Sequence, residues 1–223
     1  MHVEALYVHD ARSRIECTRE WRSKRAPRFF LGRTSAGHLW RFRTDLPDDL
    51  ARELEDLCRD EPVSDELPHS PLHREEFVRL LESHLPVERI WAGPAHWLSS
   101  DVVPSARTIE IRDANADLLR GGLEDWLEDV PHRQPFQGVI EEGRAVSVCA
   151  SVRITDAAHE AGVETLPDFR LRGHAVDVVA GWAAAVRKLR AVPLYSTSWE
   201  NTASRSVAAR LGSSMFGVDF HVT

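Results

Sequence analysis

The sequence predicts a mixed α/β fold in which helices pack against a mixed sheet, and three observations indicate it. The 223 residues are 43% hydrophobic and 28% charged, which is typical of a soluble globular protein with a sizeable core. Runs of alternating hydrophobicity, typical of strands, are interspersed with runs of helical period. In the second half these runs follow the order β-α-β-β-β-α-β-α-β, so helices are expected against a curved sheet.

Composition and cysteine usage exclude several classes of protein. The three cysteines, Cys17, Cys58 and Cys149, lie far apart, which argues for a reducing compartment and against a disulfide framework or a thiolate metal site. The net charge of -7 argues against a nucleic-acid partner. No apolar window reaches the roughly 18 residues of a membrane helix, and residues 1–14 lack the pattern of a secretory signal. We therefore expect a cytoplasmic protein with no membrane partner.

The first half is expected to consist of strands followed by helices. Residues 29–43 alternate in hydrophobicity around a turn at 35–37, which predicts a hairpin. Residues 45–60 carry Pro47 and acidic residues in their first turn and then leucines at helical spacing, which predicts a helix.

A second helix, a strand and a linker are expected to follow. Over residues 70–86 the helix would have Ser70 as its N-cap and Pro71 at its first position. Residues 89–98 predict a strand that is broken at Gly93-Pro94. Residues 99–107 are the best candidate for a linker between the two halves.

The second half opens with a strand over 107–113 and a helix over 115–130, which Gly121 and Gly122 weaken. Residues 135–154 then give a strong hairpin signal, two β-rich runs around a turn at 141–144. The remaining expected elements are a strand over 159–166, an amphipathic helix over 175–189, a strand over 192–199, a helix over 202–210 and a strand over 215–222. Asn201 is expected to cap the shorter helix, which Gly212 ends.

The turn before the amphipathic helix has the features of an anion site. The first N–H groups of a helix have no partner inside it, and the helix dipole adds partial positive charge there. Gly173 lets the backbone approach a phosphate closely, and Ala175 adds little bulk. Arg170 and Arg172 supply positive charge at the rim. The alternative is a tight strand-to-helix turn with solvated arginines.

The spacing Arg170-x-x-Gly173-x-Ala175 resembles the pyrophosphate-binding signature of the GNAT superfamily, the acyl-CoA-dependent N-acetyltransferases. In that family the signature stands between a central strand and a central helix, as the elements expected here do.

A second stretch is similar to the family's second coenzyme A element. It has Asn201 at a helix start, Ser204 three residues later and Leu211-Gly212 at its end. The resemblance covers roughly residues 106–223. It implies a GNAT-type acyltransferase domain there and says little about the first half. We expect residues 1–105 to form an N-terminal α/β extension packed against that domain, as a lid or a substrate-side domain.

The resemblance implies acetyl-CoA as the cofactor and an N-acetyltransferase as the activity. The acetyl group would pass by direct attack to a primary amine of a small molecule or peptide. The residues implied in cofactor binding are Val163, Thr165, Arg170, Leu171, Arg172, Gly173, His174, Ala175, Asn201 and Ser204. One alternative is a catalytically silent acyl-CoA-binding or sensor module, and another is an interaction protein whose first half recruits a partner. Formation of a homodimer is a further possibility that the sequence does not decide.

Two glutamates are candidates for the base that deprotonates the amine. Strand alternation puts Glu160 and Glu164 on one face, opposite Val163 and Thr165. Glu160 stands where many family members carry a strand glutamate and is the first candidate; Glu164 is the second. The alternative for both is a strand carboxylate that faces solvent or pairs with an arginine. The eleven histidines invite a metal interpretation, but solvated or core histidines are favoured, so no metal site is expected.

The sequence departs from the family in two ways. Where many members place a tyrosine as the acid toward the sulfur, this chain has Ala208, so the general acid is unassigned; Tyr195, Ser196 and Ser198 lie on the preceding strand. The family usually ends in a two-stranded hairpin, but only one strand is expected after Gly212. We therefore hypothesise that the first half supplies a replacement strand or a lid, so that both halves pack as one unit.

Overall fold

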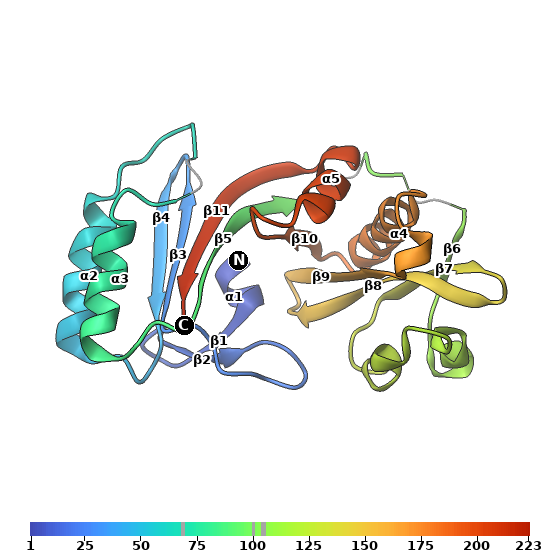
Figure 1. The fold of residues 1–223 in the computed structure, drawn as a ribbon, viewed down its shortest axis with the longest axis horizontal. Coiled ribbons are helices and arrows are strands. Elements are labelled where there is room, and N and C mark those ends of the chain that lie inside the picture. Colours follow the sequence, from blue (N-terminus) through green and yellow to red (C-terminus); the bar gives the residue numbers. More distant parts are fainter. Residues whose placement is uncertain (68–69, 100, 104–105) are drawn as a thin grey trace.

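The computed structural model describes residues 1–67, 70–99, 101–103 and 106–223, whose strands form a small and a large sheet (Figure 1). The small sheet pairs β1 (Tyr7–His9) with β2 (Ile15–Thr18). The large sheet contains β3 (Phe29–Thr34), β4 (Gly37–Phe42), β5 (Ile90–Trp97), β6 (Thr108–Glu110), β7 (Phe136–Glu141), β8 (Arg144–Ile154), β9 (Ala158–Thr165), β10 (Val192–Ser196) and β11 (Ser214–Val222). Their order across this nine-stranded sheet is β4-β3-β11-β5-β10-β9-β8-β7-β6.

Helices cover both ends of the large sheet. The α-helices are α1 (His2–Leu6), α2 (Asp48–Asp60), α3 (Arg74–His84), α4 (His174–Lys188) and α5 (Thr202–Arg210). The 3-10 helices are η1 (Asp113–Leu119), η2 (Glu124–Asp129) and η3 (Pro167–Phe169). Figure 1 shows α2 and α3 beside β3 and β4, and α4 against the other end, over β8 and β9. No described helix is long and apolar enough to cross a membrane.

The two largest hydrophobic cores among the described residues hold these layers together. One lies under α4, where Val178, Trp182 and Val186 are buried against β7 and β8, as the helical period predicts. The other lies between the helix pair α2–α3 and the sheet, around Phe77 and Phe220. Fully burying such an apolar side chain contributes about 1.5–3 kcal/mol, so these two faces fix where the helices dock.

The first half of the chain completes the sheet of the second half, which confirms the hypothesis of a replacement strand. β5 lies between β10 and β11 and pairs antiparallel with both. The other edge of β11 pairs with β3. Without β5 and β3, β10 would lose one partner and β11 both, leaving buried N–H and C=O groups unpaired. The division into residues 1–105 and 106–223 stays a prediction.

The strand β5 is continuous, so the predicted break at Gly93-Pro94 is wrong. The carbonyl of Pro94 accepts a hydrogen bond from Thr197 N at 3.3 Å, and the proline therefore stays within the sheet. A Cβ on Gly93 would lie 1.8 Å from the carbonyl oxygen of Thr197. The glycine thus permits a close backbone approach and does not interrupt the strand.

The predicted helix over residues 115–130 is also wrong, because the chain forms η1 and η2 instead. Gly121 and Gly122, between them, have φ angles of +97° and +130°, which a helix cannot contain. The carboxylate of Glu124 accepts hydrogen bonds from both glycine N–H groups, at 2.6 and 2.9 Å. A side chain just beyond the glycine pair thus fixes the interruption.

The helix predicted over residues 70–86 begins later than expected, at Arg74, and Ser70 is not its cap. The carboxylate of Glu61 accepts hydrogen bonds from the N–H groups of Leu72 (2.6 Å) and His73 (3.2 Å), which holds this segment outside the helix. Leu72 is consequently 68% exposed.

The other expected elements are present. Both hairpins, the helix after Pro47, the strand β6, and the succession of strands and helices from β7 to β11 agree with the sequence pattern. The predicted linker, 99–107, falls partly outside the described residues, at Ser100, Pro104 and Ser105.

Candidate functional site

The sheet opens at one point, between β9 and β10. These two strands are parallel, and they pair only over Ala158–Glu160 of β9. On its other side β9 stays paired with β8 as far as Thr165. From Ala161 to Thr165 the edge of β9 that faces away from β8 therefore has no strand partner among the described residues. We call this opening the splay.

Glu160 stands where the splay begins. Its Oε1 accepts hydrogen bonds from Ser196 N (2.7 Å) and Ser196 Oγ (2.6 Å), so the carboxylate satisfies an N–H at the end of β10, where pairing with β9 stops. Its Oε2 has no hydrogen-bond partner among the described residues, although the residue is only 1% exposed. Burial raises the pKa of Glu160, against the Ser196 hydrogen bonds and the charge of Arg153. A buried carboxylate with one free oxygen can accept a proton.

Two further buried groups complete an acid–base cluster. His2 Nε2 lies 3.8 Å from Glu160 Oε2, and His2 Nδ1 lies 3.6 Å from Asp219 Oδ2. Burial, and then the charge of Glu160, raises the pKa of Asp219 well above its usual range. Burial, and then the charge of Arg153, lowers the pKa of His2 to about 4. The imidazole is therefore neutral near pH 7.

Sequence reasoning missed both partners of Glu160. The sequence did contain an indication of Asp219, because it is a single carboxylate within the apolar strand 215–222. Nothing in the sequence indicated His2, because it lies far from Glu160 along the chain. A cavity of about 170 Å³ borders His2 and Asp219, and its walls include Phe30 and Phe216. His2 and Asp219 therefore line a small, mainly apolar opening, whereas Glu160 lies behind them and does not line it.

The predicted phosphate turn has two residues in the left-handed backbone conformation. Gly173 is the N-cap of α4 and has φ +86°. Leu171 has φ +63°, a left-handed conformation that is costly for a branched side chain, and it is fully exposed. A left-handed residue followed by a right-handed one, here Gly173 and the helical His174, turns successive N–H groups to one side and forms a nest for an anion.

The start of α4 supplies further donors. Its first backbone hydrogen bond runs from Asp177 N to Gly173 O at 3.1 Å. The N–H groups of His174, Ala175 and Val176 therefore have no acceptor inside the helix. A Cβ on Gly173 would meet only Arg210 Nη2, at 3.7 Å, so the surface above the turn is open.

Arginines surround the turn. Arg170 is exposed and donates through Nε to Thr165 O at 3.3 Å. Arg172 donates to Asp168 O at 2.8 Å. Arg210 was not among the predicted residues; the end of α5 brings it over Gly173. The sequence feature that could have indicated Arg210 is the basic last turn of the helix that Asn201 caps.

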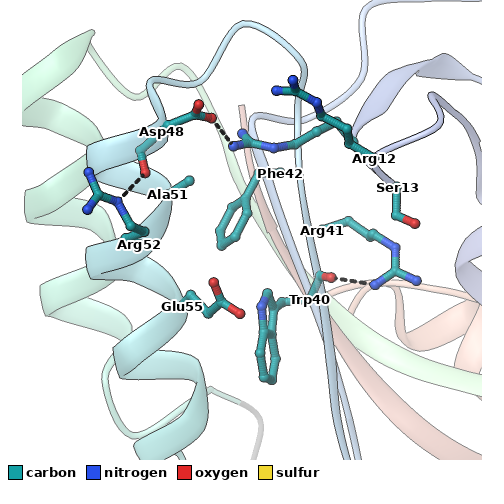
Figure 2. Close-up of a pocket in the computed structure, with 10 residues that line it drawn as sticks. Arg12, Ser13, Trp40, Arg41, Phe42, Asp48, Ala51, Arg52 and Glu55 are labelled. Carbon is teal, nitrogen blue, oxygen red and sulfur yellow. Dashed lines mark hydrogen bonds and ion pairs between the residues drawn. The ribbon is translucent and has the colours of Figure 1, made fainter.

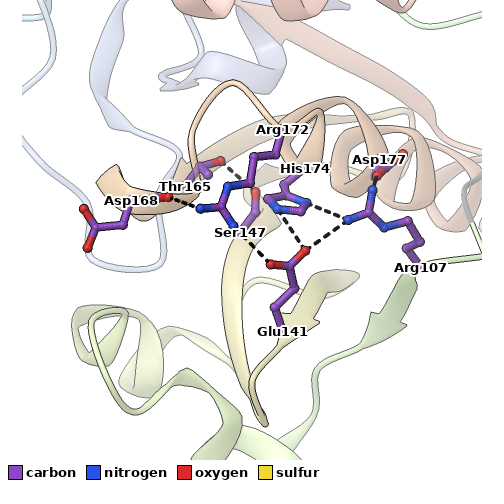
Figure 3. A network of polar contacts seen from close by, with 8 residues as sticks. All are labelled: Arg107, Glu141, Ser147, Thr165, Asp168, Arg172, His174 and Asp177. Carbon is purple, nitrogen blue, oxygen red and sulfur yellow. Dashed lines mark hydrogen bonds and ion pairs between the residues drawn. The ribbon is translucent and has the colours of Figure 1, made fainter.

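A polar network lies beside the turn (Figure 3). The carboxylate of Glu141, at the end of β7, lies 3.2 Å from His174 Nε2 and 3.6 Å from Arg172 Nη1. Arg107 reaches His174 Nδ1 at 3.1 Å and the carboxylate of Asp177 at 3.1 Å. The imidazole of His174 is thus buried within the network, and the backbone N–H is what this residue offers to a ligand.

Two predicted cofactor residues on β9 have side chains engaged elsewhere. Thr165 Oγ1 lies 2.8 Å from Ser147 Oγ, and Val163 packs against the core under α4. Any contact to a ligand in the splay would therefore use their backbone groups. Glu164 is exposed, and its Oε2 accepts a hydrogen bond from Trp126 Nε1 at 2.6 Å, so it anchors η2 to the strand.

The second predicted element has the expected cap. Asn201 Oδ1 accepts a hydrogen bond from Ser204 N at 3.0 Å. Ser204 Oγ lies 2.6 Å from the hydroxyl of Tyr195, whose pKa burial raises to about 12. Ala208 is buried in the core. Among the described residues, no group of three or more His, Cys, Asp or Glu side chains is placed to hold a metal ion.

Comparisons with known proteins show the fold. No family model matches the sequence, and no curated protein matches it. An acetyltransferase assigned to the GNAT family from Novosphingobium aromaticivorans superposes with a TM-score of 0.51 at 16% identity, over 61% of this chain and 65% of that chain. This chain therefore spans less than two thirds of that protein.

Two further solved structures match over more of their length. A GCN5-related N-acetyltransferase-like protein from Streptococcus suis has a TM-score of 0.50 at 16% identity, over 89% of this chain and 85% of that chain. A GCN5-related N-acetyltransferase from Sphaerobacter thermophilus has a TM-score of 0.51 at 13% identity, over 87% and 75%. The resemblance to the GNAT superfamily is thus confirmed as a likeness of fold.

Proposed function

We propose that this chain, which has the fold of the GNAT acetyltransferases, moves an acetyl group from acetyl-CoA to a primary amine of a small molecule or peptide. One observation carries the proposal: a buried carboxylate with a free oxygen stands at the mouth of the splay. The nest at the start of α4 supports it, because a coenzyme with a pyrophosphate needs such a site.

The residues around the splay fit acetyl-CoA. The N–H groups of His174, Ala175 and Val176 would hold the pyrophosphate, with Arg170 and Arg210 adding charge. Gly173 supports this assignment, since the space above it is open. The unpaired edge of β9 offers backbone groups to the pantetheine amides and the acetyl carbonyl. Asn201 and Ser204 stand at the start of α5, as the second coenzyme A element requires.

Glu160 would act as the general base. Ser196 fixes one carboxylate oxygen and leaves Oε2 to accept the proton of the amine. The amine nitrogen then forms a bond to the acetyl carbon, and the carbon–sulfur bond breaks to release the thiolate. A raised pKa strengthens Glu160 as a base near neutrality, provided that it is ionised, so turnover should rise with pH through that pKa.

His2 and Asp219 would give the proton a way out. The neutral imidazole of His2 can take the proton from Glu160 through Nε2 and release one from Nδ1 toward Asp219. The present separations of 3.8 and 3.6 Å would have to shorten, as catalytic contacts often do on substrate binding. The cavity beside His2 and Asp219 would then serve as the path for the amine and for water.

Departure of the thiolate would need no phenol in α5. Ala208 occupies the position where a tyrosine is frequent in the family. A thiolate with a pKa of about 8.5 is an adequate leaving group near neutral pH. The hydroxyl of Tyr195 is engaged with Ser204, so the general acid stays unassigned.

The test is consumption of acetyl-CoA in the presence of a panel of primary amines, with thiol release and the acetylated product both measured. We expect at least one amine to be acetylated. The buried Ala208 favours a second candidate, a silent acyl-CoA-binding module. Tight binding of acetyl-CoA without turnover across the panel would support that module and contradict the enzyme.

A further inference from the structure

A large recess lies in the first half of the chain, between α2, the edge strand β4 and the loop 10–14 (Figure 2). Its volume is about 630 Å³, within the range of sites for small organic ligands. It shares no lining residue with the splay or with the turn at α4. The proposed acetyl transfer therefore leaves this recess without a role.

The recess concentrates positive charge in an acidic protein. Four arginines and two carboxylates line it, whereas the whole chain has a net charge of -7. Both carboxylates already have cationic partners. Asp48 pairs with Arg14 at 2.6 Å, and Glu55 pairs with Arg59, outside the recess, at 2.7 Å. Of the remaining arginines, Arg41 lies 3.7 Å from Glu4 Oε1, outside the recess, so the charge left for an anion is that of Arg12 and Arg52.

Two arginines are the best placed to bind it. Within the described part of the chain, Arg52 donates only through Nε, to Asp48 O at 3.2 Å, and this leaves both terminal nitrogens for a ligand. Arg12 has no carboxylate partner among the described residues. The loop that carries Arg12 is held firmly, because Asp10 Oδ1 accepts hydrogen bonds from Arg12 N and Arg14 N, each at 2.8 Å.

An aromatic wall indicates what accompanies the anion. Figure 2 shows Trp40 and Phe42 lying between α2 on one side and Arg41 and Ser13 on the other. Trp40 is partly exposed, so the indole offers a flat apolar surface on which a planar ring can stack. The volume is far larger than an inorganic anion needs. A single carboxylate would also leave part of the excess charge unmatched.

We propose that this recess binds an organic phosphate monoester that carries a planar ring. Its phosphate would contact the guanidinium groups of Arg12 and Arg52, and its ring would lie against Trp40. A dianionic phosphate matches the excess of positive charge, and guanidinium groups bind phosphate oxygens through strong charge-assisted hydrogen bonds.

Calorimetric titration of the full chain at low salt tests the proposal, with adenosine 5′-monophosphate, adenosine and inorganic phosphate as probes. We expect the monophosphate to bind with one-to-one stoichiometry, phosphate to bind more weakly and adenosine more weakly still. The double variant Arg12→Gln/Arg52→Gln should weaken monophosphate binding on the order of tenfold or more. Arg79→Gln, an exposed change on α3, is the matched control and should have no effect.

Two more variants separate the parts of the proposal. Trp40→Leu should weaken binding of the monophosphate but not of inorganic phosphate. Gly173→Asp should leave monophosphate binding intact, which separates this recess from the coenzyme site proposed at α4. Absence of monophosphate binding, or equal affinity in the Arg12/Arg52 variant, would overturn the proposal. Loss of binding only in Gly173→Asp would place the ligand at α4 and overturn it as well.

Discussion

At the scale of single residues, Gly173 decides whether the start of α4 can accept a phosphate. Gly173→Asp should abolish acetyl-CoA binding, because it puts a negative charge on the open surface beside Arg210. Gly173→Asn is the matched control. It has similar size, tolerates positive φ comparably and carries no charge, so it should bind acetyl-CoA more weakly but measurably. Calorimetry on both folded variants decides, and unchanged affinity in the aspartate variant would remove the proposed site.

The buried carboxylate of Glu160 should change how the free energy of unfolding depends on pH. Its folded-state pKa is raised by burial, so its contribution to stability is fully present below the unfolded-state pKa and is lost as pH rises through the folded-state pKa. Glu160→Gln should therefore raise the melting temperature above that of the native chain at pH 8. The two chains should converge toward pH 4.

Melting curves from pH 4 to 8 measure this difference. Glu164→Gln is the matched control, since Glu164 is exposed on the same strand, and its melting curves should show no such pH-dependent gain. A constant offset between Glu160→Gln and the native chain at every pH would mean that Glu160 ionises as freely in the folded protein as in the unfolded one.

At the scale of elements, the cap of α5 links stability to ligand binding. Asn201→Ala removes the hydrogen bond to Ser204 N and should cost about 1 kcal/mol of unfolding free energy. It should also weaken acetyl-CoA binding if, as proposed, Asn201 is part of a second coenzyme A element. Chemical denaturation and calorimetry measure the two effects. A variant that is less stable but binds with full affinity would show that Asn201 is only a cap.

In the strand β5, Gly93 should not tolerate substitution by a residue with a side chain. In Gly93→Ala the new Cβ would lie 1.8 Å from the carbonyl oxygen of Thr197, so the backbone after β10 must move. We expect a loss of more than about 2 kcal/mol in the free energy of unfolding. Gly32→Ala is the control, because its Cβ would approach only side-chain atoms, at 3.3 Å or more. Equal destabilisation of both variants would contradict the close approach.

The local sequence pattern predicted most helices and strands but not the residues at which some of them begin or end. The apolar spacing of α4 and the cap of α5 were readable because neighbours in sequence determine them. The late start of α3 was not, because a carboxylate from outside that segment, Glu61, holds the backbone. The interruption at Gly121-Gly122 was not either, because it depends on the carboxylate of Glu124 turning back onto the glycine N–H groups. The break predicted at Gly93-Pro94 was wrong because β10 and β11, the strands that pair with β5, are distant from it in the sequence.

At the scale of the whole molecule, the candidate site is an outcome of sheet assembly. The turn at Gly173 could be predicted, because its chemistry is contiguous in sequence. The cluster of His2, Glu160 and Asp219 could not, because it needs α1, β9 and β11 to meet on one face of the sheet. The extension before residue 106 therefore does more than cover the second half, since it contributes β5 to the sheet and His2 to the acid–base cluster.

The most direct measurement of the central claim is the rate of acetyl transfer to an accepted amine by three chains: the native protein, Glu160→Gln and Glu164→Gln. The account predicts that Glu160→Gln lowers turnover on the order of a hundredfold with acetyl-CoA affinity nearly intact, since a positioned general base contributes at least that much. Glu164→Gln should stay near the native rate. Transfer by Glu160→Gln at the native rate across pH 6 to 9 would contradict the account.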